Sequence, residues 1–273
     1  MDYKLIASDL DGTLLGPDGR VSEENWKAIE QLKEMGVEFV PASGRAFYEM
    51  PDELRQSHLI RYYITSDGTM VYDKETGETW ELAMPRQIGH KTLDIIYEYP
   101  HCMMLHADRN SYMDADKNDL AFYGSIHMDS SWVDLVGVAD VMKENFREFA
   151  YGLDSIQSVC AFFYTKEELE ECIKRLEATG ELLVAQSDEW NLEVFHTSAG
   201  KGNALYLLAD KLGIPREATI AMGDSTNDLT MVKAAGLGLA MDNAVEELKA
   251  VADRVICKNS QHGVQFVLNE YFK

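Results

Sequence analysis

The sequence has few residues of several kinds, and each shortage excludes a class of protein. Among 273 residues there are only four cysteines, Cys102, Cys160, Cys172 and Cys257. No two of them have the C-x-x-C spacing of a metal site, and they do not form the dense pattern of a disulfide-stabilised secreted domain. We therefore expect reduced and mostly buried thiols.

Basic residues are also scarce. The 25 Lys and Arg residues face 47 Asp and Glu residues, which gives a net charge of −22. Nucleic acids are bound through Lys and Arg side chains that neutralise phosphates, so we expect no nucleic-acid partner. An anionic membrane surface would be repelled for the same reason. A small anionic substrate stays compatible with this charge if its site supplies a cation of its own.

Long apolar stretches and targeting signals are missing as well. No apolar run approaches the ~18 residues of a membrane span. The start, Met1-Asp2-Tyr3-Lys4, has neither the basic nor the apolar region of a signal peptide. The seven histidines form no H-x-x-x-H or H-E-x-x-H pattern. These features predict a cytoplasmic protein without a membrane partner, and they carry no signal for a particular oligomeric state.

Both ends of the chain alternate between strand and helix patterns. Near the N-terminus, an apolar run at residues 5–7 precedes a helix capped by Ser22, and a second strand follows at 37–42. Near the C-terminus, a helix follows Gly202 and runs through Leu205, Leu208 and Leu212, and it leads to a buried strand at 218–222. A further helix and strand then follow it. This order predicts an α/β fold with a Rossmann-like parallel sheet.

The middle of the chain has a different character. Residues 62–66 and 69–73 predict a hairpin, and from about residue 82 short strands mix with helical patterns such as 166–179. We therefore predict an inserted α+β domain at 82–194 and a core built from 1–81 and 195–273. Three large aromatic residues in the insert, Tyr112, Trp132 and Trp190, are expected in its core or at an interface.

Polar side chains occur where the predicted core strands end. Asp9 and Asp11 are two residues apart, so on a strand both carboxylates would point the same way and need a compensating cation. Ser43, Lys201 and Asp224 stand at or just past other strand ends. Because ligands bind at the carboxyl ends of strands in open parallel sheets, we expect these groups to share one crevice.

These residue types suit phosphoryl chemistry with a hard metal ion. Carboxylates at 9, 11 and 224 form an all-oxygen site of the kind that Mg²⁺ prefers. Lys201, the Ser43 hydroxyl and the Gly44 backbone N–H are phosphate-binding groups. A carboxylate can attack phosphorus to give an aspartyl phosphate, while a neighbouring carboxylate moves the proton.

The chain resembles the haloacid dehalogenase (HAD) superfamily over its whole length. Asp9-Leu10-Asp11-Gly12-Thr13 is similar to the first motif of that family, and Ser43-Gly44-Arg45 to the second. Lys201-Gly202 is similar to the third motif, and the segment from Gly223 to Asp228 to the fourth. The insert between the second and third motifs resembles the α/β cap of the Cof-type phosphatases, subclass IIB.

The resemblance implies roles for individual residues. Asp9 would be the nucleophile and Asp11 the general acid and base. The Asp9 carboxylate, the Asp11 backbone carbonyl and Asp224 would hold Mg²⁺. Ser43, Gly44 and Lys201 would bind the phosphoryl group. Asn227 and Asp228 would complete the site, the latter by orienting Lys201.

Two positions near this predicted site leave alternatives open. Arg45 is equally compatible with a substrate contact and with a structural ion pair. The family usually has Asn-Gly after the third strand, whereas this chain has Asp67-Gly68. An acid there either alters selectivity or serves the turn, and we favour the turn because Asp tolerates its backbone shape.

The predicted function is hydrolysis of small phosphomonoesters, such as sugar phosphates or related metabolites, by a Mg²⁺-dependent phosphatase whose cap selects the substrate. A phosphomutase or phosphotransferase would use the same intermediate with another acceptor. A non-catalytic sensor of phosphorylated metabolites would not need both Asp9 and Asp11. A serine esterase built on Ser225 and His262 would leave the aspartate pair unexplained.

Overall fold

The computed structural model describes residues 2–117, 120–125, 141–186 and 189–272. The chain divides into two compact units. The first contains Met1–Arg45, Met50–Glu81 and Ala199–Lys273, and the second contains Ala46–Glu49 and Leu82–Ser198. Among the described residues, no helix combines the length and apolar character that crossing a membrane requires.

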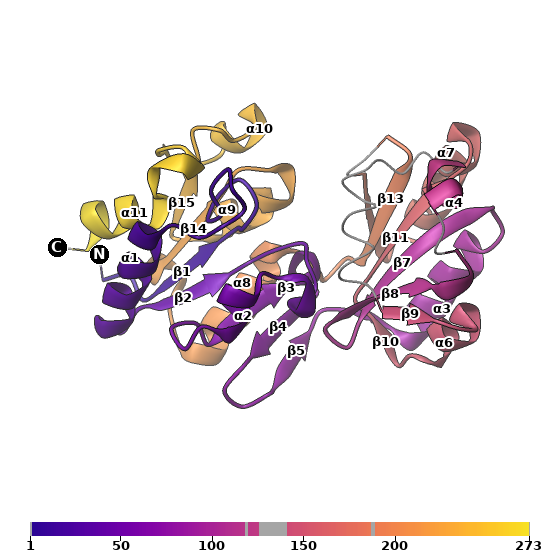
Figure 1. The fold of residues 1–273 in the computed structure, drawn as a ribbon, viewed down its shortest axis with the longest axis horizontal. Helices are drawn as coiled ribbons and strands as arrows, with labels where there is room; N and C mark the ends of the chain where they lie inside the picture. Colours follow the sequence, from indigo (N-terminus) through magenta and orange to yellow (C-terminus); the bar gives the residue numbers. More distant parts are fainter. Residues whose placement is uncertain (1, 118–119, 126–140, 187–188, 273) are drawn as a thin grey trace. The chain divides into compact units, whose positions relative to one another are not determined.

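The first unit is built on a parallel sheet of five strands in the order β16-β15-β14-β1-β2 (Figure 1). Its strands are β1 (Leu5–Ser8), β2 (Glu38–Pro41), β14 (Thr219–Gly223), β15 (Leu237–Ala240) and β16 (Arg254–Val255). β1 lies inside the sheet and pairs with β14 on one side and β2 on the other. All four of its side chains are buried, which explains the apolar run at residues 5–7.

The direction in which the chain crosses the sheet reverses between β1 and β14. The chain leaves β1 toward β2 but leaves β14 in the opposite direction, toward β15. Because such crossovers are right-handed, their helices lie on opposite faces of the sheet. The helices of this unit are α1 (Glu23–Glu34), α2 (Asp52–Gln56), α8 (Lys201–Leu212), α9 (Leu229–Ala234), α10 (Glu246–Lys249) and α11 (Gly263–Tyr271). Ligands bind at such reversal points in doubly wound sheets.

Helix α1 begins as the sequence predicted. The Ser22 hydroxyl accepts the N–H of Asn25 at 3.2 Å and so caps the helix. Asn25 is itself buried, and its side-chain oxygen accepts the N–H groups of Val264 and Gln265. One buried amide thus ties the start of α1 to the start of α11, which packs beside it.

A separate antiparallel sheet completes the first unit. It consists of β3 (Tyr62–Thr65), β4 (Met70–Asp73) and β5 (Thr79–Glu81). The predicted hairpin is therefore present, with a tight turn at Ser66–Gly68. An isolated parallel bridge between Ala42 and Ile64 joins this sheet to the end of β2.

The second unit contains a six-stranded sheet in the order β12-β13-β11-β7-β8-β9. Its strands are β7 (His101–Ala107), β8 (Asn110–Asp114), β9 (Val141–Lys143), β11 (Ser158–Phe163), β12 (Leu182–Ala185) and β13 (Asn191–His196), beside a small pair of β6 (Met84–Pro85) and β10 (Ser155–Ile156). Alternate residues such as Leu105, Val159 and Leu192 form an apolar core with α3 (Arg86–Ile96), α6 (Phe146–Gly152) and α7 (Lys166–Glu177). A further short helix, α4, spans Leu120–Ser125.

The insert differs from its predicted extent at two places. The boundary at residue 194 would cut β13, which pairs continuously with β12 through His196. The short helical turn Phe47–Glu49, assigned to the core from sequence, groups with the second unit. Of the aromatic residues singled out, Tyr112 is buried and Trp190 packs on a second apolar cluster, while Trp132 lies outside the described residues.

Candidate active site

Asp9 stands directly after β1 and is held there by the sheet. Its N–H donates to the Met222 carbonyl of β14 at 3.0 Å, so the backbone pairing continues one residue past the strand. The side chain is only 6% exposed. An ionised carboxylate buried to this extent requires a partner.

Lys201 provides that partner from the first turn of α8. Its ammonium is fully buried and lies 2.7 Å from Asp9 Oδ1 and 2.7 Å from Asp228 Oδ1. A Cβ on the next residue, Gly202, would lie 2.4 Å from the Thr230 carbonyl oxygen, so glycine lets α8 approach α9 closely. The Lys-Gly pair therefore places one cation between two buried acids.

Asp228 uses both of its carboxylate oxygens within the protein. Oδ1 accepts from Lys201, and Oδ2 accepts the N–H groups of Asp224 at 2.9 Å and Ser225 at 3.1 Å. The sequence predicted that Asp228 orients Lys201, and the structure places the two side chains in contact. Asp228 also fixes the loop that carries Asp224.

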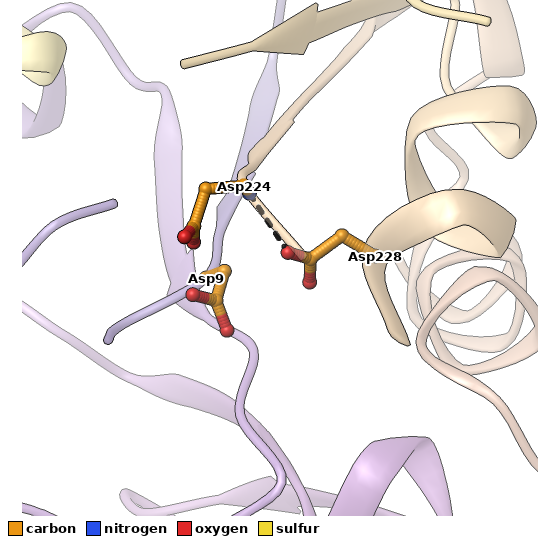
Figure 2. A group of neighbouring side chains, drawn as sticks. All are labelled: Asp9, Asp224 and Asp228. Carbon is orange, nitrogen blue, oxygen red and sulfur yellow. Dashed lines mark hydrogen bonds between the residues drawn. The ribbon is translucent and has the colours of Figure 1, made fainter. Parts of the chain in front are cut away.

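Three carboxylates gather at the ends of β1 and β14. Asp9, Asp224 and Asp228 each offer an oxygen within 4.8 Å of the others, and Figure 2 shows them turned toward one another. Since the oxygens of Asp228 are already occupied, Asp9 and Asp224 are the better ligands of a cation. Their hard oxygen donors fit Mg²⁺, which takes few carboxylates and keeps positions for water and phosphate.

The charges of these groups depend strongly on one another. Burial raises the pKa of Asp9 well above its usual range, Lys201 opposes that rise, and Asp228 and Asp224 add to it. Burial also raises the pKa of Asp224, against a hydrogen bond from Thr13. Burial alone would lower the pKa of Lys201. The negative charges of Asp228, Asp9 and Asp67 raise it by more than burial lowers it, so the ammonium stays charged.

Two residues of the turn after β1 hold Asp224. The Thr13 hydroxyl donates to Asp224 Oδ1 at 2.9 Å. Gly12 has a positive φ of 83°, and a Cβ there would lie 2.2 Å from Asp224 Oδ2. Sequence reasoning gave Thr13 no role of its own, although the Asp-Gly-Thr pattern contained the signal.

Two asparagines from the C-terminal segment brace the same turn. The Asn243 amide donates to the Gly12 carbonyl at 2.8 Å, and Asn259 donates to the Leu15 carbonyl at 3.0 Å. The N–H of Asn259 also donates to Asn243 at 2.9 Å. No pattern in the sequence points to these contacts, because each spans more than 200 residues of chain or depends on a neighbouring loop.

Asp11 does not join the carboxylate group, because Arg45 binds it. The guanidinium donates to both of its oxygens, at 2.9 Å from Nε and 2.8 Å from Nη2. A two-point contact of this kind fixes the direction of a carboxylate as well as its place. Of the two alternatives for Arg45, the structure therefore shows the ion pair.

Ser43 and Gly44 form a bend beside the turn that carries Asp67. Ser43 is buried, and its hydroxyl accepts the N–H of Arg45 at 3.2 Å. Asp67 lies against Gly44 and accepts the side-chain N–H of Asn227 at 2.9 Å. The structure thus brings Gly44, Asn227 and Asp67 together at one edge of the site.

The serine-esterase alternative lacks its essential contact. His262 has its Nδ1 2.9 Å from the Ser22 hydroxyl at the start of α1. Ser225 instead forms a capping box with Asp228. The two side chains therefore serve different helix termini, whereas a catalytic serine needs a histidine within hydrogen-bond distance.

Comparisons with known proteins agree with this geometry. Residues 6–268 match the model of a family of haloacid dehalogenase-like hydrolases. The phosphatase YwpJ of Bacillus subtilis is 33% identical to the chain over 97% of this chain and 98% of that protein. The 5-amino-6-(5-phospho-D-ribitylamino)uracil phosphatase YcsE of the same bacterium is 29% identical over 97% and 94%. A solved haloacid dehalogenase-like hydrolase from B. subtilis, 31% identical, superposes with a TM-score of 0.79 over 98% of this chain and all of that one.

These matches span nearly the whole chain and include the three clustered carboxylates. The chain belongs to the haloacid dehalogenase superfamily, among the Cof-type phosphatases, as the motifs predicted. It is thus a hydrolase of phosphoric monoesters with an α/β core.

Proposed function

We propose that the protein is a Mg²⁺-dependent phosphatase that hydrolyses small phosphorylated metabolites, such as sugar phosphates, through an aspartyl phosphate on Asp9. The observation that carries the proposal is the position of Lys201 between Asp9 and Asp228, beside Asp224. Asp9 is an acid that burial would protonate, and Lys201 favours its ionised and nucleophilic form. A structural ion pair would not need the additional carboxylate of Asp224 at the same strand ends.

The metal has identifiable ligands in this proposal. The Asp9 carboxylate, the Asp11 backbone carbonyl and the Asp224 carboxylate would hold Mg²⁺, with Thr13 orienting Asp224. A bound Mg²⁺ would offset the repulsion between an anionic nucleophile and an anionic substrate. Ser43, the Gly44 N–H, Lys201 and Asn227 would bind the oxygens of the phosphoryl group.

Two displacements at phosphorus complete the reaction. An oxygen of Asp9 bonds to phosphorus while the bond from phosphorus to the leaving oxygen breaks, and Asp11 gives that oxygen a proton. Water then bonds to phosphorus, Asp11 accepts a proton from it, and the bond to Asp9 breaks to release orthophosphate. The two hydrogen bonds from Arg45 would hold the Asp11 carboxyl in one orientation during both proton transfers.

The names of related proteins support the proposed substrate class. Relatives across the whole chain include phosphatases of 5-amino-6-(5-phospho-D-ribitylamino)uracil and an HMP-PP phosphatase, whose names specify small phosphorylated compounds. The second unit would act as the cap predicted from the sequence: it would select among such compounds and exclude water from the site.

Phosphate release from a panel of phosphorylated metabolites, with Mg²⁺ and with a chelator, tests the proposal. We expect turnover that requires Mg²⁺ and that falls by at least ~10³-fold in Asp9→Ala. Asp18→Ala, a change of the same kind in an exposed loop, should keep full activity. Substantial turnover by Asp9→Ala would refute the mechanism. Transfer of phosphate to a sugar in preference to water would instead identify a phosphotransferase.

A further inference from the structure

We propose that Asp67 is a specificity-determining residue that weakens the binding of phosphate dianions at this site and so promotes release of orthophosphate. The inference deepens the proposed function and rests on it for its biological meaning. Asp67 lies in the first unit with all the groups that it affects.

Several of the predicted phosphate-binding segments fix the position of Asp67. Its N–H donates to the Ser43 carbonyl at 3.1 Å, and its backbone adopts the left-handed conformation, with φ 53° and ψ 33°. A Cβ on the following glycine, Gly68, would lie 2.3 Å from the Gly200 carbonyl carbon and 2.5 Å from the Lys201 nitrogen. The turn therefore fits tightly between the Ser43 bend and the start of α8.

The carboxylate of Asp67 points at phosphate-binding groups rather than at solvent alone. One oxygen would lie 2.9 Å from a Cβ on Gly44, and the other accepts the Asn227 amide at 2.9 Å. Its negative charge is also among those that raise the pKa of Lys201. Asp67 thus occupies one donor of Asn227 and offsets part of the positive charge that would attract an anion.

A count of charges shows how much one carboxylate matters here. When ionised, Asp9, Asp67, Asp224 and Asp228 bring four negative charges to the single positive charge of Lys201, a total of −3. A divalent cation changes this total to −1, and the loss of the charge on residue 67 would change it to zero. A phosphate dianion therefore meets a repulsive site in this protein and a neutral one in the variant.

The substitution Asp67→Asn isolates that charge. Asparagine keeps the shape and an oxygen that can accept from Asn227, and it tolerates a positive φ as aspartate does. At an effective dielectric constant of about 20, the interaction of one carboxylate charge with a nearby anion is strong enough to change a dissociation constant by about tenfold or more. We therefore expect the variant to bind orthophosphate about tenfold more tightly.

Calorimetric titration with inorganic orthophosphate, in Mg²⁺ and at two salt concentrations, measures the effect directly. The advantage of Asp67→Asn should shrink at high salt, where charge interactions are screened. Its KM for a phosphomonoester and its inhibition constant for orthophosphate should fall together. Asp210→Asn, which removes an exposed charge from α8, serves as the matched control and should bind orthophosphate as the unaltered protein does.

The outcomes separate this inference from the proposed function. Equal or weaker binding by Asp67→Asn, the same gain in Asp210→Asn, or no binding in any of the three proteins would overturn the role of Asp67. Absence of phosphate release by the unaltered protein would refute the phosphatase instead, and the binding comparison would still decide the effect of the charge.

Discussion

Replacing Lys201 with methionine should destabilise the first unit strongly, and the structure gives the size of the effect. The ammonium is fully buried and is the shared partner of two buried carboxylates, each 2.7 Å away. Removing one member of a buried ion pair costs about 3–5 kcal/mol, because the remaining charge loses its partner. We expect Lys201→Met to lose about 4 kcal/mol of unfolding free energy at pH 8 without metal.

The loss should depend on pH in a defined direction. Burial already raises the pKa of Asp9, and without Lys201 that pKa rises further. A carboxyl whose folded-state pKa exceeds its unfolded value destabilises the fold above the folded pKa, and the penalty disappears as pH falls through it. The difference between variant and unaltered protein should therefore be largest near pH 8 and shrink toward pH 5. Mg²⁺ should also stabilise Lys201→Met more than it stabilises the unaltered protein, because the variant lacks the ammonium that competes with the metal for the carboxylates.

Urea denaturation measures the free energy, and hydrogen exchange in β1 and β14 assigns the change to the first unit. Lys211→Met, on the exposed face of the same helix, is the control and should change stability by less than about 1 kcal/mol. Equal urea midpoints for Lys201→Met and the unaltered protein in chelator would show that the ion pairs contribute no net stability. A destabilisation that grows toward acid pH would refute the assignment to Asp9.

Two further predictions concern the scaffold around the site. Burial of Asp73 tends to raise the pKa of its carboxyl. Hydrogen bonds from Arg61 and from the N–H groups of Glu75 and Thr76 outweigh this effect and lower the pKa overall. Ionised Asp73 should therefore stabilise the fold above pH ~4, and this stabilisation should be lost as the pH falls through the lowered pKa. Asp73→Asn should make the stability less dependent on pH in the acid range and should cost about 2 kcal/mol of unfolding free energy at pH 7. An unchanged pH dependence in the acid range would contradict this. Gly202→Ala should cost about 1–3 kcal/mol and slow phosphate release, since its Cβ would press on the Thr230 carbonyl; unchanged thermal unfolding and turnover would refute the close helix contact.

Much of the core could be predicted from local sequence. Ser22 and the helical spacing after it defined the start of α1, and the buried strands were visible as apolar runs. The site residues were found because parallel strands end at a common edge, so Asp9 and Asp224 were expected to share one crevice. The prediction of Asp228 beside Lys201 came from the family resemblance instead.

Other features depend on contacts that no local pattern encodes. The sequence left Arg45 between two roles, because only the folded chain shows that its guanidinium reaches Asp11. The predicted boundary at 194 fell inside β13, since strand pairing continues past the point where the composition changes. Phe47–Glu49 joined the second unit through contacts such as the N–H of Tyr48 to the carbonyl of Arg109, about 60 residues away.

The pairing of β1 with β14 also determines when the parallel sheet can be completed during synthesis. The contacts that define the site join distant parts of the chain: Lys201 and Asp9 are 192 residues apart, and Thr13 and Asp224 are 211 apart. At synthesis rates of about 5–20 residues per second, the ribosome needs about 10–40 s to reach β14 after making β1. During that interval an apolar strand remains unpaired on one edge, so the nascent chain should depend on chaperones or on rapid folding of the intervening unit to avoid aggregation.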